Sequence, residues 1–353
     1  MSRVPYFLVA FIAIVLTACI TLNFSRTSNL CDEEYERAFQ QYYRIFSPPV
    51  PDSLFFAGER VPLEIYHVHE RFVRELLVNV YWQSNIILLM KRANRYFPII
   101  EPILEEMGAP SDLKYLALAE SGFTSGVSPA GARGFWQFLR PTAIDMRLEV
   151  NNYVDERYHL EKATRAAVRY MRRLYERFGS WTLAAAAYNT GQGNIRRHVQ
   201  NQQTRDYYEL HLPEETMRYV FRILALKTIF EDPMRYGIIL REQDLWQPIP
   251  VRTVVVDTTI NNLFAFAREQ GTTFQQLRAL NPWLRRDRLP NRNRKRYVIS
   301  LPLDPSLLRE NLFAMSAGEN IFLQGEDIFE EDEDIFEDDE DTFEEEEDIF
   351  EEN

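Results

Sequence analysis

A glutamate, Glu120, occupies an apolar position in a short helical pattern and could act as a general acid. Leu113, Leu116, Ala117 and Glu120 recur at spacings of three and four residues, so they share one helix face. A carboxyl group on a buried face is costly unless it is paired or protonated. Partial burial would raise its pKa from about 4.3 toward about 6, where it can donate a proton near neutral pH. A buried glutamate paired with an arginine would give the same pattern, so position alone leaves both interpretations open.

The ends of this helical pattern are also marked in the sequence. Ser111 is interpreted as its N-cap, and Gly122 as the residue that ends it.

Polar and aromatic side chains follow Glu120 along the chain. Residues 128–137 form a loop with two glycines and a proline, and the loop ends in an aromatic pair and Gln137, residue types that stack on and hydrogen-bond to a sugar. An alanine-rich helix later delivers Tyr188 and Asn189 just before a glycine that can end it. An aromatic residue alone is more often part of a core, and an Asn near Gly is usually a turn residue. Together these segments predict a polar-aromatic cleft around one carboxylic acid.

Four motifs in this order resemble those of lytic transglycosylases of the soluble-lytic-transglycosylase type. They are Glu120-Ser121, Gly134-Phe135-Trp136-Gln137, Ala187-Tyr188-Asn189 and Glu215-Thr216-Met217-Arg218-Tyr219-Val220. The resemblance covers residues 50 to 230. The second motif departs from the family pattern, which usually has Leu with Met or Trp between the Gly and the Gln. The Gln itself is kept.

The resemblance implies cleavage of the β-1,4 bond between N-acetylmuramic acid and N-acetylglucosamine in peptidoglycan. Glu120 would protonate the glycosidic oxygen and then, as a carboxylate, take the proton from the C6 hydroxyl of the muramyl sugar. That hydroxyl would attack its own anomeric carbon and leave a 1,6-anhydro end. The internal nucleophile replaces the second carboxyl group that most glycosidases use. Two alternatives stay open: a hydrolase of the goose-type lysozyme kind, and a non-catalytic peptidoglycan-binding protein.

The resemblance also assigns the residues around the acid. Ser121 and Gln137 would position the glycan, and Tyr188 and Asn189 would line the subsite of the muramyl sugar. Tyr219 would hydrogen-bond toward Glu120, although without the resemblance it would be interpreted as a core aromatic residue on a helix face. No cofactor is expected. We expect no metal site at His67 and His69 either, because alternate residues of a helix point to different faces.

The elements that carry these residues predict a mainly α, lysozyme-like α+β catalytic domain over residues 51–245. Residues 62–107 are interpreted as two helices broken near Pro98. Leu160–Phe178 has an apolar stripe opposite a face rich in arginine, which is interpreted as a solvated face rather than a glycan-contacting patch. No strand hairpin is evident in this part of the chain, so its sheet should be small or missing.

A second, smaller domain is predicted over residues 251–303. Strands are expected at 252–257 and 297–302, with helices at 260–270 and 273–280 between them. This β-α-α-β order resembles the LysM module, which binds glycans that contain N-acetylglucosamine. The module's usual Gly-Asp-Thr is replaced by Asp257-Thr258-Thr259-Ile260, so a small packing domain without glycan binding is the alternative.

The N-terminus has the features of an export signal. An arginine precedes an apolar run that ends in Leu16-Thr17-Ala18-Cys19, which looks like a bacterial lipobox. We expect a lipoprotein signal peptide at 1–19, lipidation of Cys19 and a tether at 20–50. Residue 20 is Ile, not the Asp that retains enteric lipoproteins in the inner membrane, so an outer-membrane anchor on the periplasmic side is favoured. The alternative is an uncleaved anchor from Pro5 to Phe24.

Charge is distributed unevenly along the chain. Residues 326–353 hold 19 acidic residues and no basic ones, whereas the other residues have 34 acids against 40 Lys and Arg, a net charge of +6. A mildly cationic body suits anionic peptidoglycan strands as the partner. No nucleic-acid partner is expected, because no recognised nucleic-acid module or dense basic run is present. Residues 304–353 are interpreted as a linker and a disordered acidic tail, with a basic protein as a possible partner and a membrane-tethered adaptor as a remote alternative function.

Overall fold

The computed structural model describes residues 36–37, 45–304, 306 and 312. The predicted signal peptide at 1–19 with Cys19, most of the tether and the acidic tail lie outside the described residues. The described chain forms two compact units. One comprises the chain up to Ile87 together with Ser180–Ile239, and the other comprises Leu88–Gly179 together with the chain from Leu240 onward.

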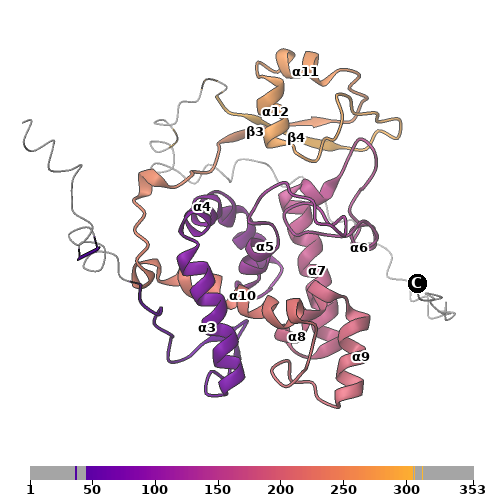
Figure 1. Cartoon of the computed structure of the whole chain (residues 1–353). Coiled ribbons are helices and arrows are strands. Elements are labelled where there is room, and N and C mark those ends of the chain that lie inside the picture. The colour runs from indigo at the N-terminus through magenta and orange to yellow at the C-terminus, as the bar shows by residue number, and fades with distance from the viewer. Residues whose placement is uncertain (1–35, 38–44, 305, 307–311, 313–353) are drawn as a thin grey trace, which may run out of the picture. The chain divides into compact units, whose positions relative to one another are not determined.

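The first unit is a group of packed helices with one short hairpin. Its elements are β1 (Phe55–Phe56), β2 (Glu59–Arg60), α3 (Tyr66–Tyr81), α8 (Trp181–Thr190), α9 (Gln192–Gln202), α10 (Glu214–Glu231) and the short helix η2 (Pro233–Tyr236). Helix α3 packs along α10, and α8 contacts α9 and α10 (Figure 1). Fully buried side chains such as Phe72 and Leu76 of α3 and Val220 and Leu224 of α10 form the core of this unit. The hairpin confirms that the sheet of the catalytic region is small among the described residues.

The helix break predicted near Pro98 is wrong. Helix α4 (Gln83–Glu106) continues through Pro98 and Pro102, and the break lies at Trp82, between α3 and α4. A proline inside a helix costs roughly 3 kcal/mol. Beyond Pro98, α4 buries Ile100, Ile103 and Leu104, each worth roughly 1.5–3 kcal/mol. Packing therefore outweighs the local penalty, which the sequence pattern alone could not weigh.

The second unit begins with most of α4 and continues through a helical region that carries the loop of the second motif. Its elements up to the following domain are α5 (Leu113–Ser121), α6 (Arg140–Asp145), the short helix η1 (Glu156–Tyr158), α7 (Leu160–Phe178) and the short helix η3 (Glu242–Asp244). Helix α7 has the bounds that the sequence predicts, and the apolar stripe from Leu160 to Phe178 is buried except for Tyr175. On its arginine face, Arg165 pairs with Glu106 at 2.5 Å and Arg173 with Asp145 at 2.5 Å.

The C-terminal part of the second unit is the predicted βααβ domain. Strand β3 (Val251–Val256) pairs antiparallel with β4 (Tyr297–Pro302), and α11 (Leu263–Glu269) and α12 (Phe274–Leu280) lie between them in sequence (Figure 1). Asn262 caps α11, and Thr273 forms a capping box at the start of α12. Asn281 then exchanges two hydrogen bonds with the backbone of Ser300, at 2.6 and 2.9 Å. The second helix is thereby fixed to β4.

No helix within residues 36–37, 45–304, 306 and 312 is long and apolar enough to cross a membrane.

Candidate active site

Glu120 lies one residue before the end of α5. The helix buries Leu113, Leu116 and Ala117, whereas Glu120 is only partly buried. Gly122 ends the helix in the left-handed conformation at a φ of 52°, and its N–H donates to the Leu118 carbonyl oxygen at 2.9 Å, which confirms the predicted C-terminal stop. The carboxyl group is therefore carried at the end of a helix whose preceding turns are buried in the core.

The predicted N-cap of this helix, Ser111, is wrong. Asp112 is the capping residue, and no side chain caps the helix. The N–H of Leu113 donates to the Pro110 carbonyl oxygen at 3.1 Å, and the N–H of Lys114 donates to that of Ser111 at 3.2 Å. Because a tight backbone turn already satisfies these donors, no side-chain cap is needed there.

Ser121 joins the end of α5 to the turn formed by residues 134–138, which we call the catalytic turn. Its hydroxyl donates to the Phe135 carbonyl oxygen at 2.7 Å and accepts from the Phe123 N–H at 3.0 Å. The hydroxyl is thus used to connect two backbone segments. Whether it also positions a glycan stays a prediction.

Gln137 occupies the catalytic turn in the left-handed conformation, with a φ of 47°. Its Nε2 donates to the carbonyl oxygens of Gly134 at 2.9 Å and Gly126 at 3.2 Å. An L-residue with positive φ is uncommon and persists where surrounding contacts hold it. The side chain is partly buried and closes its own turn.

The aromatic pair of the second motif does not offer a surface for sugar stacking. Trp136 is 0% exposed and its Nε1 donates to Thr164 Oγ1 at 3.0 Å, while Phe135 is 9% exposed and packs near Tyr96. The expectation that the pair stacks on a sugar is therefore wrong. Both rings anchor the catalytic turn to the core, and the polar residue that follows them stays closer to the surface.

In the first unit, Tyr188 and Asn189 lie at the C-terminal end of α8, where Gly191 stops the helix as predicted. Asn189 Oδ1 accepts from Thr216 Oγ1 at 3.1 Å, so the end of α8 is bonded to the start of α10. Tyr219 follows on α10 and is 2% exposed. Its predicted hydrogen bond to Glu120 stays a prediction.

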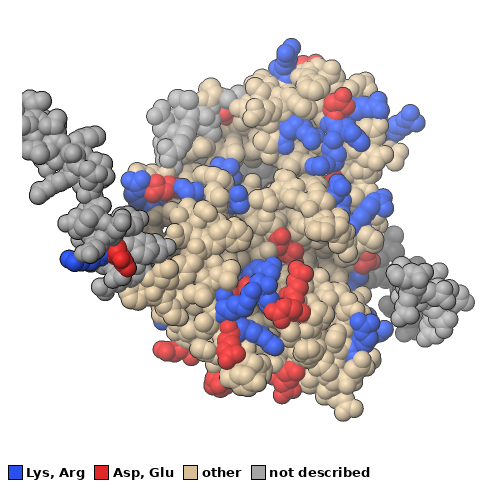
Figure 2. Space-filling view, viewed as in Figure 1, with Lys and Arg blue, Asp and Glu red and all other residues tan. Residues whose placement is uncertain are grey.

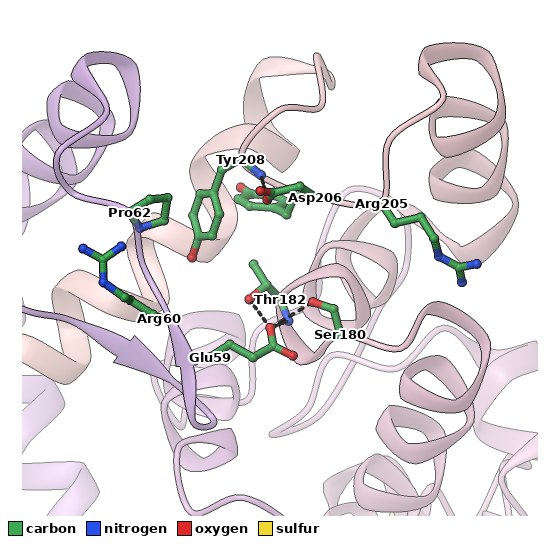
Figure 3. A pocket seen from close by; sticks show the side chains of 9 residues that line it. Glu59, Arg60, Pro62, Ser180, Thr182, Arg205, Asp206 and Tyr208 are labelled. Carbon is green, nitrogen blue, oxygen red and sulfur yellow. Dashed lines mark hydrogen bonds between the residues drawn. The ribbon is translucent and has the colours of Figure 1, made fainter.

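Sequence reasoning missed Glu59, which fixes the start of α8. Its carboxylate accepts from the Trp181 N–H at 2.5 Å, from the Thr182 N–H and hydroxyl at 2.9 and 2.6 Å, and from the Ser180 hydroxyl at 2.9 Å. A carboxylate at a helix N-terminus also complements the helix dipole. Figure 3 shows the bonds from Ser180 and Thr182 on one wall of a pocket of about 380 Å³ that Tyr208 also lines. No local pattern marks Glu59, because its partners lie more than 120 residues further along the chain.

His67, which the sequence raised as a metal-ligand candidate, has its Nε2 within 3.0 Å of the Tyr208 carbonyl oxygen. Within the part of the chain that the structure describes, no cluster of three or more His, Cys, Asp or Glu side chains could hold a metal ion.

Two parts of the chain match known domain families. Residues 97–211 match the Transglycosylase SLT domain, and residues 252–305 match the Soluble lytic transglycosylase C-terminal LysM-like domain. These matches follow one another in the order that the sequence predicts, a lysozyme-like catalytic domain and then a βααβ LysM-like domain, which confirms the fold class.

The chain is also similar to curated proteins. Two Escherichia coli proteins, from strains K12 and O6:H1, are called Membrane-bound lytic murein transglycosylase D and are 34% identical over 159 residues. The match covers 43% of this chain and 35% of each relative, so it spans about a third of their length. Among solved structures, the 70 kDa soluble lytic transglycosylase of Escherichia coli matches with a TM-score of 0.34 and 21% identity, over 43% of this chain and 27% of that one.

Proposed function

We infer that this chain is a peptidoglycan lytic transglycosylase, because it carries a match to the transglycosylase SLT domain followed by a match to a LysM-like domain. It cleaves the β-1,4 bond between N-acetylmuramic acid and N-acetylglucosamine and leaves a 1,6-anhydro end. The observation that carries this proposal is the placement of Glu120 inside the matched domain. The residue is partly buried near the C-terminal end of α5, which Gly122 terminates, and it lies beside the catalytic turn.

Glu120 serves as both acid and base in the proposed reaction. Its neutral carboxyl group gives a proton to the glycosidic oxygen as the C1–O bond breaks. The C6 hydroxyl of the same muramyl sugar then forms a bond to C1 and returns its proton to the carboxylate. The acid is regenerated, no water is consumed, and no second carboxyl group is required, in contrast to most glycosidases.

The other proposed site residues bind the glycan. Tyr188 and Asn189 take the muramyl sugar, and the hydrogen bond that Asn189 Oδ1 accepts from Thr216 Oγ1 holds the amide of Asn189 in one orientation. Gln137 and Ser121 position the sugar next to the acid, and Tyr219 orients Glu120. Support for the first four is their place at the ends of helices or in the catalytic turn, where each side chain is partly buried. In this proposal the catalytic domain spans residues 51–245.

Mass spectrometry of digested sacculi tests the reaction. Anhydro products, each lighter by one water than a hydrolysis product, are expected from the wild type and should be lost with Glu120→Gln. Reducing-end products would assign the chain to a goose-type lysozyme-like hydrolase. If cleavage is unchanged in Glu120→Gln, Glu120 is not the catalytic acid. If the wild type binds sacculi without cleaving them, the chain is a non-catalytic peptidoglycan-binding protein.

The proposal places this enzyme in the cell envelope, on the periplasmic side. Support comes from the lipobox-like Leu16-Thr17-Ala18-Cys19 after an apolar run. Cys19 carries the lipid, and the outer membrane is the favoured location. Metabolic labelling with a fatty-acid analogue should mark the wild type and leave Cys19→Ser unlabelled, and fractionation should move that variant away from the outer membrane. Labelling that persists in Cys19→Ser would contradict the lipid anchor.

The LysM-like domain, residues 251–303, is proposed to bind peptidoglycan glycan strands. These residues hold ten Lys and Arg against three Asp and Glu, a net charge of +7. Figure 2 shows Lys and Arg gathered on this domain at the top of the view. A cationic surface favours an anionic polymer. Co-sedimentation with sacculi should weaken as salt rises, and salt-independent retention would contradict the electrostatic part of the proposal.

A further inference from the structure

A loop of the catalytic region, residues 149–159, belongs structurally to the LysM-like domain as well. Val154 and Tyr158 are buried in the same apolar cluster as Leu277 and Leu284 of that domain. The Asp155 N–H also donates to the Trp283 carbonyl oxygen at 2.9 Å. The 149–159 loop therefore forms part of the LysM-like core rather than resting on its surface.

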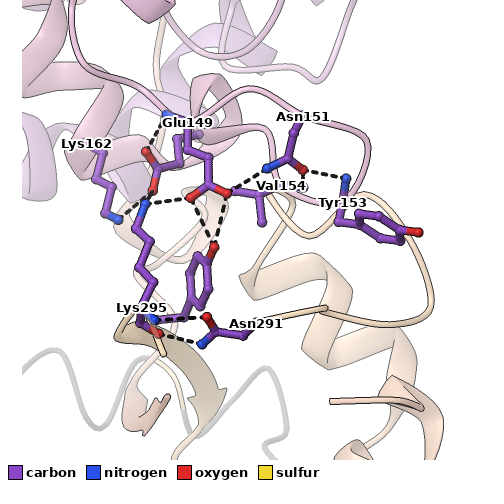
Figure 4. A network of polar contacts seen from close by, with 9 residues as sticks. Glu149, Asn151, Tyr153, Val154, Lys162, Asn291 and Lys295 are labelled. Carbon is purple, nitrogen blue, oxygen red and sulfur yellow. Dashed lines mark hydrogen bonds and ion pairs between the residues drawn. The ribbon is translucent and has the colours of Figure 1, made fainter. Parts of the chain in front are cut away.

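Polar contacts hold the same loop at a second place (Figure 4). Lys295 pairs with Glu149 at 2.5 Å and lies 3.6 Å from Glu156. Glu149 also accepts from the Tyr297 hydroxyl at 3.1 Å, and Glu156 accepts from Lys162 at 2.7 Å. Glu156 further accepts from the Glu149 N–H at 2.8 Å, which closes the loop on itself. The LysM-like domain thus holds the loop at two places, through the apolar cluster around Leu277 and Leu284 and through the polar contacts of Lys295 and Tyr297.

From this loop, Arg157 reaches the catalytic turn. Its guanidinium bonds both carboxylate oxygens of Asp155 at 2.8 Å, and its Nη1 donates to the Phe138 carbonyl oxygen at 3.1 Å. The side chains of Arg157 and Asp155 are 4% and 5% exposed. A buried two-point Arg–carboxylate pair has a fixed geometry, so the position of Phe138 depends on where the loop holds Arg157.

The backbone of Arg157 touches the other end of the catalytic turn. Gly134 has a φ of +80°, and a Cβ built on it would lie 1.8 Å from the Arg157 carbonyl oxygen. No other residue type fits at this distance. The turn is therefore held at Gly134 and at Phe138 by one residue of the loop, and Ser121 bonds the turn to the helix end that carries Glu120.

We propose that the LysM-like domain supports the catalytic turn through the 149–159 loop, and that Arg157 is the positioning residue in this connection. The inference rests on the proposed function of Glu120. The LysM-like domain has a role in turnover that is separate from glycan binding. Loss of binding alone raises KM for long strands, whereas loss of this support lowers kcat even on short soluble glycans that do not need the second domain.

The test compares two variants of the full chain, Arg157→Lys and Arg157→Met, on short soluble peptidoglycan strands. Lysine keeps the charge but not the two-point geometry, so it should fold and lower kcat about tenfold. Methionine should lower kcat about a hundredfold, the size of effect that a misplacement of about 1 Å can cause. KM should rise by no more than about threefold in both, because Gln137 is the one proposed glycan-binding side chain that the turn itself carries, so the loss in kcat should be the larger effect.

Arg165→Met is the matched control, because it breaks an Arg–carboxylate pair with Glu106 in the same unit without touching the catalytic turn. It should retain kcat. The positioning role is overturned if folded Arg157→Lys keeps the wild-type kcat. It is also overturned if Arg165→Met loses as much kcat as the Arg157 variants do. Cleavage by the wild type and its loss in Glu120→Gln establish the proposed function separately, so a failure of the Arg157 inference leaves that result standing.

Discussion

Glu75 on α3 and Glu120 on α5 are both helix glutamates among apolar neighbours, but their surroundings differ. Glu75 is 1% exposed, pairs with Arg74 and accepts from Arg218 Nε at 2.7 Å. The hydrogen bond to Glu75, together with the negative charge of Glu75, raises the pKa of Arg218. Glu120 is partly exposed at the end of its helix, next to the catalytic turn.

The contrast separates a structural carboxylate from a candidate catalytic one. The ordinary explanation for a glutamate on a buried helix face, an ion pair with arginine, is found at Glu75. There the charge is enclosed, and no glycan can reach it. At Glu120 the helix ends one residue later and the side chain is partly exposed, as the proposed catalytic role requires. Position within the helix and exposure are therefore the features by which we propose to distinguish the two roles.

The largest expected effect is on turnover. Glu120→Gln should lower kcat by roughly 10²–10⁴-fold, because an amide cannot donate the proton that the leaving oxygen needs. The unfolding midpoint should change little. Glu75→Gln should retain kcat at temperatures where it is folded, as measured by product release from soluble peptidoglycan strands. If both variants lost turnover equally, Glu120 could not be distinguished from the structural carboxylate Glu75 by its effect on kcat.

For stability the order of the two variants is reversed: Glu75→Gln should lose more free energy of unfolding than Glu120→Gln. Glu75→Gln leaves two arginines without their shared carboxylate, and breaking a fully buried ion pair costs about 3–5 kcal/mol. Because Arg74 and Arg218 are 48% and 28% exposed, solvent screening should reduce the loss to roughly 1–3 kcal/mol. Urea unfolding of Glu75→Gln and Glu120→Gln measures the difference. A larger loss in Glu120→Gln would mean that Glu120 is the structural carboxylate.

Assigning a pH profile to Glu120 requires the pH dependence of folding to be known, and His159 is expected to contribute to it. Burial, helped by the positive charge of Lys162, lowers the pKa of His159 from its usual 6.5 to about 3. The folded state then favours the neutral ring, and the unfolded chain binds the extra proton. This contribution is complete above about pH 6.5 and is lost as pH falls toward about 3.

His159→Phe keeps the ring that stacks on Trp283 but not the proton. Its stability should fall less steeply than that of the wild type between pH 6.5 and pH 4, with a difference of at most about 1.4 kcal/mol per pH unit for one proton. Thermal unfolding at several pH values measures the two slopes. Parallel slopes would exclude His159 as the group that titrates.

The smallest effect is expected from the acidic tail. Its 19 carboxyl groups lie outside the matched domains, and the proposed reaction uses one carboxyl group only. Deletion of residues 326–353 should therefore leave kcat and the anhydro product unchanged. Loss of cleavage on deletion would place a second required acid in the tail.

Part of the candidate site could be predicted from local pattern. Glu120 follows from the spacing of Leu113, Leu116 and Ala117, and its helix stop follows from Gly122, because the side-chain period of a helix and the freedom of glycine at positive φ act over a few residues. The four ordered motifs indicated the domain family for the same reason, since each motif is short and contiguous.

The tertiary structure decided which side chains are buried and what they contact. Trp136 lies in the core, Glu59 caps a helix more than 120 residues away, and Arg157 connects the LysM-like core to the catalytic turn. These contacts join segments far apart in sequence, and their free energy comes from burial and from donors that meet only after folding. Periodicity can identify a helix face, but only the packed chain determines the partner of each buried polar group.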